Sequence, residues 1–275
     1  MINVLFCGSK NVFDGVLTGT LSMLRRSSND VYNVIVFTMD MTEMNKKFEP
    51  INEKQIACLD KLLKEHNPGS KATLIDVKEI YTRELGGCPN EKAYCSPYTL
   101  IRLLADLVEG MPDKLLYLDC DIMFNRDVHL LYDQDIEKYE YAGACDHYGK
   151  YILLHHFRYL NAGVLLFNMK KCRETGLFEK ARNLLRKKKF LFADQTAIVK
   201  STKKRKYLKQ RFNDQKFLHK WTVIRHFAKR LFYLPYPHTA NIKQWDIESM
   251  HKIYKYHQFD DILDEYLERK KEYSD

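Results

Sequence analysis

Short apolar runs alternate with amphipathic segments over the first 77 residues of the chain. The runs at residues 2–7, 31–38 and 73–77 are rich in apolar and β-branched residues, which predicts three buried strands. Between them, apolar residues recur at helical spacing over residues 12–26 and 54–65, which predicts two amphipathic helices. Strand, helix, strand, helix, strand is the order that builds a parallel sheet covered on both faces, so the pattern predicts an α/β fold.

The rest of the chain continues this pattern less regularly. Pro97 suits the first position of a helix that runs to Leu107, and residues 114–118 predict a fourth strand. We expect further strands at 141–144, 162–167 and 222–227, a helix at 178–188 and a long amphipathic helix at 247–270. No repeat, low-complexity run or linker divides the chain. We therefore expect a mostly parallel α/β domain over residues 1–245 and a helical C-terminal extension over residues 246–275.

The composition is that of a globular protein, because 45% of the 275 residues are hydrophobic and 29% are charged. No window reaches the roughly 18 uninterrupted apolar residues of a membrane span, and the first residues lack the basic region of a signal peptide. The seven cysteines are scattered and include no Cys-x-x-Cys pair. We therefore expect a cytoplasmic protein with free thiols.

Basic residues are concentrated in residues 182–230, the basic sector, which contains seventeen Lys and Arg against only two acids, Asp194 and Asp214. The formal net charge of the whole chain is +9, so the remainder is net acidic. The densest part is the run at residues 200–211, and the aromatic residues Phe217 and Trp221 follow it. A charge run is usually a solvated loop or helix face, but this asymmetry favours an anionic partner: a membrane surface, a phosphorylated substrate or nucleic acid.

Two carboxylates follow the predicted fourth strand directly, in the sequence Leu115-Leu-Tyr-Leu-Asp119-Cys-Asp121. Residues two apart in a continuing strand point to the same side, so Asp119 and Asp121 can converge on one point. Two unpaired carboxylates would repel each other there, and a divalent cation between them removes that cost. Oxygen ligands suit Mg²⁺ or Mn²⁺, and ligands bind at the carboxyl ends of strands in α/β sheets. The alternative is a pair of solvated turn carboxylates or helix caps.

The chain lacks the sequence motifs of several other classes of α/β protein. The turn after the first strand does not supply the Gly-x-Gly-x-x-Gly of a dinucleotide-binding fold. The chain has neither a Gly-x-x-x-x-Gly-Lys phosphate loop nor a Gly-x-Ser-x-Gly nucleophile elbow. A glycosidase needs two carboxyl groups about 5–9 Å apart across a scissile bond, and the adjacent Asp119 and Asp121 fit joint metal ligation better.

Several short motifs follow one another along the chain. They are Ile2-Asn-Val-Leu-Phe-Cys-Gly-Ser-Lys-Asn11, Ser96-Pro-Tyr-Thr-Leu-Ile-Arg102, Leu115-Leu-Tyr-Leu-Asp-Cys-Asp121, Tyr159-Leu-Asn-Ala-Gly-Val-Leu-Leu-Phe-Asn168, Ala193-Asp-Gln195, Arg211-Phe-Asn213 and Lys243-Gln-Trp245. Each alone is weak evidence, but the ordered set resembles the retaining glycosyltransferases of family 8, which include bacterial galactosyl- and glucosyltransferases and glycogenin. The resemblance covers nearly the whole chain and implies that residues 1–245 form a catalytic domain with the GT-A fold.

The resemblance implies a metal site and a UDP-hexose donor. Asp119 and Asp121 would hold Mn²⁺, or Mg²⁺, which would neutralise the diphosphate of the donor as the glycosidic bond breaks. A third ligand in the family is a histidine that precedes a Lys-Pro-Trp sequence. Two histidines compete for this role, because His226 has the strand context whereas His238 has nearly the family spacing to Lys243. We favour His226 with an inserted segment after it, and keep His238 as the alternative.

The resemblance also implies which residues contact the substrates. Those expected to bind the nucleotide-sugar are Cys7, Gly8, Ser9, Asn11, Arg102, Asp119, Cys120, Asp121, Asn161, Ala162 and Lys243. Those expected at the sugar hydroxyl groups of the reaction centre are Asp146, Asp194 and Gln195. Arg102 would pair with a phosphate or carboxylate, and Lys243 would hold the leaving diphosphate. The chain departs from the family pattern at Ser9, which is often an aspartate, and at Gln244, which replaces a proline.

We therefore expect a metal-dependent, retaining glycosyltransferase that moves a hexose from UDP-glucose or UDP-galactose to a saccharide or lipid-linked acceptor in cell-surface polysaccharide synthesis. The acceptor would attack from the leaving-group side, with double displacement through Asp194 as the alternative, because the amide of Gln195 is a poor nucleophile. The basic sector with its interleaved aromatic residues, and the amphipathic C-terminal helix, would dock on the anionic cytoplasmic face of a membrane. The competing functions are a UDP-sugar-binding protein without turnover and, ranked lower, a nucleic-acid-binding protein.

Overall fold

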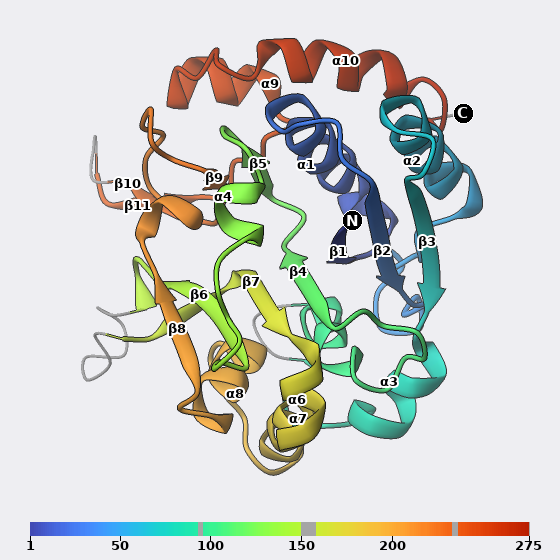
Figure 1. Cartoon of the computed structure of the whole chain (residues 1–275), viewed down its shortest axis with the longest axis vertical. Coiled ribbons are helices and arrows are strands. Elements are labelled where there is room, and N and C mark those ends of the chain that lie inside the picture. The colour runs from blue at the N-terminus through green and yellow to red at the C-terminus, as the bar shows by residue number, and fades with distance from the viewer. Residues whose placement is uncertain (93–95, 150–157, 233–235, 275) are drawn as a thin grey trace.

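Over the described residues, 1–92, 96–149, 158–232 and 236–274, the computed structural model has a seven-stranded central sheet (Figure 1). The strand order is β3-β2-β1-β4-β7-β6-β8. The bounds are β1 Ile2–Cys7, β2 Tyr32–Thr38, β3 Lys71–Asp76, β4 Lys114–Leu118, β6 Tyr141–Cys145, β7 Leu160–Asn168 and β8 Arg205–Leu208. Only β7 runs antiparallel to its neighbours β4 and β6, so this sheet is mostly parallel, as predicted.

The strands divide their side chains between two hydrophobic cores, one on each face of the sheet. In β1, Val4 and Phe6 belong to one core, and Leu5 and Cys7 belong to the other. Strands that are buried on both faces read as continuous apolar runs, which explains the pattern of the sequence. The first core is covered by α1 (Phe13–Arg26), α2 (Glu53–His66) and α10 (Asp260–Lys270). The second is covered by α3 (Lys78–Leu85), α6 (Met169–Thr175), α7 (Leu177–Lys187) and α8 (Ala193–Ser201).

Two small antiparallel sheets lie beside the main sheet. In one, β5 (Ile122–Phe124) pairs with β9 (Ile224–His226). In the other, β10 (Arg230–Phe232) pairs with β11 (His238–Ala240). The strands β10 and β11 occupy the segment that was predicted as an insertion after His226.

Two predicted helices differ from the structure, and one strand was not predicted. The helix expected from Pro97 to Leu107 is instead two short 3₁₀ helices, Pro97–Thr99 and Ile101–Leu104. Backbone bonds there join residues three apart, as from Leu103 N–H to Leu100 O at 3.0 Å, because tertiary contacts of this buried segment override the helical pattern. The run at residues 200–211, for which no element was predicted, contains β8 at the sheet edge, where charged side chains hinder pairing with another sheet.

The third difference is in the C-terminal extension. The helix expected at 247–270 is broken into α9 (Ile247–Ser249), a π-helical turn (Met250–Tyr254) and α10. The break falls at Lys255, whose φ of 55° is left-handed, and no glycine or proline marks it in the sequence. Helix α10 lies beside α1 and α2 (Figure 1), with Arg25 Nη2 2.5 Å from Glu265 Oε2. The extension therefore shares a core with the sheet, and the boundary at residue 245 stays a prediction.

Two further sequence predictions concern the surroundings of the protein. Among the described residues, no helix is both long enough and apolar enough to cross a bilayer. The six cysteines in this part of the chain form no disulfide there, and Cys95 lies outside the described residues.

Candidate active site

The Asp-Cys-Asp segment lies at the end of β4. Asp119 N–H donates to Gly163 O of β7 at 2.7 Å, so strand pairing continues one residue beyond β4. The chain then enters β5, whose pairing with β9 brings His226 beside the segment. Phe227 N–H donates to Asp121 O at 2.7 Å. Backbone pairing from two strands therefore fixes the positions from which Asp119, Asp121 and His226 project.

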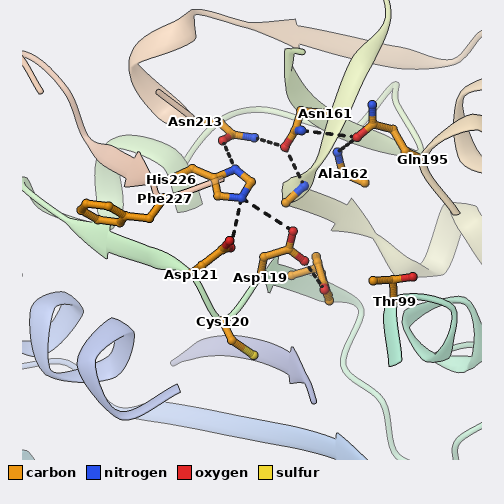
Figure 2. A network of polar contacts seen from close by, with 12 residues as sticks. Thr99, Asp119, Cys120, Asp121, Asn161, Ala162, Gln195, Asn213, His226 and Phe227 are labelled. Carbon is orange, nitrogen blue, oxygen red and sulfur yellow. Dashed lines mark hydrogen bonds and ion pairs between the residues drawn. The ribbon is translucent and has the colours of Figure 1, made fainter. Parts of the chain in front are cut away.

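Each aspartate turns one oxygen toward His226 (Figure 2) and pairs the other with a basic side chain. Asp119 Oδ1 accepts from Arg102 Nη2 at 2.9 Å, and Asp121 Oδ2 accepts from Lys243 Nζ at 2.5 Å. The remaining oxygens, Asp119 Oδ2 and Asp121 Oδ1, lie 3.8 and 3.1 Å from His226 Nε2. One ligand atom from each of the three residues lies within 4.8 Å of the other two, which is compatible with a divalent cation.

A chain of buried amides orients the imidazole ring of His226 (Figure 2). Gly163 N–H can only donate, and it donates to Asn161 Oδ1 at 2.9 Å. Asn213 Nδ2 donates to the same oxygen at 2.8 Å, which leaves Asn213 Oδ1 to accept from His226 Nδ1 at 2.9 Å. His226 Nδ1–H is therefore held by Asn213, and Nε2 faces the two carboxylates. One imidazole nitrogen and two carboxylate oxygens that face one another are ligands a divalent cation accepts, so the donor set fits a metal.

Two glycines let the backbone approach the aspartates closely. A Cβ at Gly163 of β7 would lie 2.3 Å from His226 Cε1 and 2.8 Å from Asp119 Oδ2. A Cβ at Gly15 of α1 would lie 2.0 Å from Cys120 O. Neither contact is possible without a shift of the backbone or of a ligand side chain, so both positions require glycine.

Burial and neighbouring cations act in opposite directions on the acidic side chains. Burial raises the pKa of Asp121, but Lys243 and His226 outweigh it and hold the pKa of this carboxyl well below its usual range. Burial also raises the pKa of Asp194, and Arg102 beside it offsets this effect only in part. Asp121 is therefore kept ionised, as a metal ligand must be, whereas Asp194 is more easily protonated.

A cavity of about 200 Å³ opens beside the two aspartates. Its lining residues include Cys7, Gly8, Ser9, Tyr98, Arg102, Asp119, Cys120, Asp121, Lys243 and Trp245. Most residues that were predicted to bind the nucleotide therefore meet at one cavity. Asn11 is an exception, because it is exposed and its Nδ2 donates to Lys47 O at 2.5 Å.

A second, larger cavity of about 680 Å³ shares no lining residue with the first. Asp146, Asn161 and Gln195 line it, together with the apolar side chains of Leu191 and Phe192. Gln195 Nε2 and Asn161 Nδ2 each donate to Asp146 Oδ2 at 2.9 Å. The structure therefore brings Asp146 and Gln195 together, and Asn161 connects them to the amides that orient His226.

Asp194 turns away from its neighbour Gln195 and toward Arg102. Arg102 Nε lies 3.3 Å from Asp194 Oδ2, and both side chains are buried. The same guanidinium donates to Ala162 O at 2.7 Å and stacks on the ring of Tyr117 at 4.0 Å. Arg102 therefore connects the start of α8, the backbone of β7 and the end of β4.

Lys243 and Gln244, which follow the β10–β11 sheet, both contact the segment from Asp119 to Asp121. Gln244 is fully buried, and its Nε2 donates to Cys120 O at 2.9 Å and to Thr18 Oγ1 at 3.1 Å. This amide ties α1 to the backbone between the two aspartates. The departure from proline at this position therefore adds a hydrogen-bond donor to the site.

His238 lies away from the aspartates. Its Nδ1 is 2.8 Å from Tyr236 O, and its ring stacks on Phe232 with centroids 5.5 Å apart. Of the two histidines that the sequence left open, the structure places only His226 at the aspartates.

Sequence reasoning missed Tyr117 and the role of Asn213. Tyr117 OH donates to Asp119 Oδ1 at 2.6 Å, and in the sequence it reads only as an apolar strand residue. Asn213 belongs to one of the motifs that carry the family resemblance, so the sequence does mark this residue. Its contact with His226 depends on the pairing of β9, which the sequence does not reveal.

Comparison with known proteins places this chain in a family. Residues 3–222 match the family described as glycosyl transferase family 8, and the chain belongs to that family. A protein of Haemophilus influenzae that is assigned as a glycosyltransferase is 32% identical over 138 residues. This match covers 46% of the present chain and 41% of the relative, so less than half of that protein is represented.

Solved glycosyltransferase structures share the fold at low sequence identity. The bifunctional glycosyltransferase WbbM superposes with a TM-score of 0.68 at 16% identity, over 98% of this chain and 51% of that one. The galactosyltransferase LgtC, in complex with donor and acceptor sugar analogs, gives 0.65 at 18% identity over 96% of both chains. GlyE of Streptococcus pneumoniae gives 0.63 at 18% identity, over 98% of this chain and 65% of that one. The predicted GT-A fold is thereby confirmed.

Proposed function

We propose that this protein is a metal-dependent, retaining glycosyltransferase that moves a hexose, glucose or galactose, from a UDP-sugar to a saccharide or lipid-linked acceptor. The observation that carries the proposal is the convergence of Asp119, Asp121 and His226 beside a cavity that the two aspartates line, with Asp146 and Gln195 at a second cavity. Family membership supports the same class of reaction.

The smaller cavity suits the nucleotide part of the donor. The backbone and small side chains of Cys7, Gly8 and Ser9 would contact the uridine, while Asp119, Asp121 and His226 would hold Mn²⁺ or Mg²⁺. When bound, the metal supplies Lewis-acid stabilisation of the diphosphate leaving group. Lys243, which lines the same cavity, would add a second positive charge to the leaving group.

The groups around the second cavity favour attack of the acceptor from the leaving-group side. The amide of Gln195 is a poor nucleophile, and its oxygen accepts from Ala162 N–H at 3.0 Å while its nitrogen donates to Asp146. The carboxylate of Asp194 pairs with Arg102, which is an obstacle to double displacement. We therefore propose that the leaving diphosphate accepts the proton of the acceptor hydroxyl, and that these side chains orient the two sugars.

Exposed apolar side chains within the basic sector support an acceptor presented at a membrane. Leu191, which lines the larger cavity, Phe217 and Trp221 are exposed and belong to this cationic stretch of the chain. We propose that the enzyme works in the cytoplasm and docks on an anionic membrane face to reach a precursor of a surface polysaccharide. Flotation with anionic and neutral vesicles tests this step. Equal partitioning at low salt would contradict it.

The reaction is tested by measuring UDP release from a panel of UDP-sugars with Mn²⁺, with Mg²⁺ and with EDTA. We expect metal-dependent release from UDP-glucose or UDP-galactose, with stimulation by saccharide acceptors. Binding of UDP without release from any sugar, measured by calorimetry, would instead indicate a UDP-sugar-binding protein without turnover. Absence of both would overturn the proposal.

A further inference from the structure

A second cluster of metal-ligating side chains lies in the C-terminal extension. His251 Nε2 is 2.7 Å from Asp260 Oδ1, and His257 Nδ1 is 3.2 Å from Asp260 Oδ2. The two imidazole rings stack with centroids 4.4 Å apart. One ligand atom from each residue lies within 4.8 Å of the other two.

The break between the π-helical turn and α10 creates this cluster. In a continuous helix, side chains three or four residues apart are neighbours, whereas His251 and His257 are six apart and would project from different faces. The left-handed conformation of Lys255 folds the chain back and stacks the two rings. This conformation is unfavourable for a residue other than glycine, so contacts across the break must compensate for it.

We propose that His251, His257 and Asp260 bind one transition-metal ion, with Zn²⁺ as the best match. Two imidazole nitrogens and one carboxylate are ligands that Zn²⁺ favours, whereas Mg²⁺ and Mn²⁺ prefer sites built from oxygen. Three protein ligands leave a fourth tetrahedral position for water or for an external ligand. The side chains are 34%, 64% and 41% exposed in the order His251, His257 and Asp260, so an ion can reach them from solvent.

An ion in this position would cross-link the two sides of the break. On one side, the chain before the break includes Trp245, which lines the smaller cavity. On the other side, the chain continues as α10. Helix α10 in turn forms ion pairs with α1, as between Lys270 Nζ and Asp14 Oδ2 at 2.8 Å. The site would therefore stabilise the docking of the C-terminal extension on the domain.

The test is calorimetric titration of Zn²⁺ into protein without an affinity tag. Asp121→Asn is used as the background, because it disables the other metal site. We expect one bound Zn²⁺ per chain, at least about tenfold weaker binding of Mn²⁺, and loss of the Zn²⁺ signal in the double variant His251→Ala with His257→Ala. Saturating Zn²⁺ should raise Tm by about 5 °C in the background protein and not in the double variant.

The matched control is His129→Ala. His129 also contacts two carboxylates, but it does so through opposite ring nitrogens, Nδ1 to Asp133 and Nε2 to Asp30, so it cannot bring both to one ion. Zn²⁺ binding should be unchanged in this variant. Absence of Zn²⁺ binding in the background protein, or equal binding by the double variant, would overturn the proposal. Neither result depends on whether the protein releases UDP.

Discussion

Two clusters of histidine and aspartate in this protein use similar ligands in different settings. The side chain of His226 is 4% exposed, whereas those of His251 and His257 are 34% and 64% exposed. His226 is oriented by Asn213 and lies on a paired strand, but the other two histidines meet only because a helix breaks. The comparison indicates that buried partners and strand pairing, rather than the types of side chain, distinguish the preorganised cluster from the surface cluster.

The largest expected effect is that of Asp121→Asn. This change keeps the shape of the side chain but removes the charge that Lys243 and His226 face. We expect UDP release to fall by about 1,000-fold, because a bound metal provides several kcal/mol of stabilisation to the leaving group.

The matched control for this change is Asp260→Asn in the second cluster, which should leave the rate of UDP release unchanged. A rate for Asp121→Asn within tenfold of the wild type would remove the distinction between the two clusters.

Gly163→Ala should disturb the cluster of Asp119, Asp121 and His226 and leave the second cluster unchanged. The new methyl group would collide with His226 Cε1 and Asp119 Oδ2. We expect about 100-fold slower UDP release, since a displacement near 1 Å can have that effect. Gly19→Ala is the control, because a Cβ there lies 3.4 Å from its nearest neighbours, an ordinary contact. Equal rates for the two variants would show that β7 tolerates the methyl group.

Asn213→Ala tests whether the buried amides orient His226. The variant loses the acceptor that holds the proton on Nδ1, so we expect about 10- to 100-fold weaker Mn²⁺ binding, measured by titration. Asn90→Ala is the matched control, because it also removes a buried asparagine. Asn90 Nδ2 donates to Leu185 O and Lys188 O, and these three residues are distant in sequence from Asp119 and Asp121. It should destabilise the fold without weakening Mn²⁺ binding. The same affinity in both variants would contradict a role for Asn213 in metal binding.

The smallest expected effect concerns the docking of α10. Hydrogen bonds from Arg26 lower the pKa of Asp261, with Nη1 and Nη2 each 2.8 Å from a carboxylate oxygen. The folded-state pKa is below the unfolded value, so the pair stabilises the fold above about pH 4 and loses this effect as pH falls through the folded pKa. Because Asp261 is 54% exposed, we expect less than about 1 kcal/mol.

Thermal unfolding of wild type and Asp261→Asn measures this effect. The difference in Tm between them should be present at about pH 6 and should shrink at about pH 3. A difference that grows as pH falls would contradict the assigned sign.

Much of the fold and part of the site could be predicted from the sequence, because they depend on local patterns. The strand over residues 114–118 and the pair Asp119 and Asp121 are visible as an apolar run that ends in two carboxylates. The choice between His226 and His238 is not local, since it depends on the pairing of β5 with β9. The break at Lys255 was also missed, because no residue there disfavours a helix strongly enough to mark it.

We propose that Asp119, Asp121 and His226 hold a divalent metal. This is tested by a Mn²⁺ titration followed by electron paramagnetic resonance, with UDP present, for wild type, His226→Ala and His238→Ala. We expect one bound Mn²⁺ in the wild type, at least about tenfold weaker binding in His226→Ala and unchanged binding in His238→Ala. Unchanged Mn²⁺ affinity in His226→Ala, or loss of binding only in His238→Ala, would contradict it.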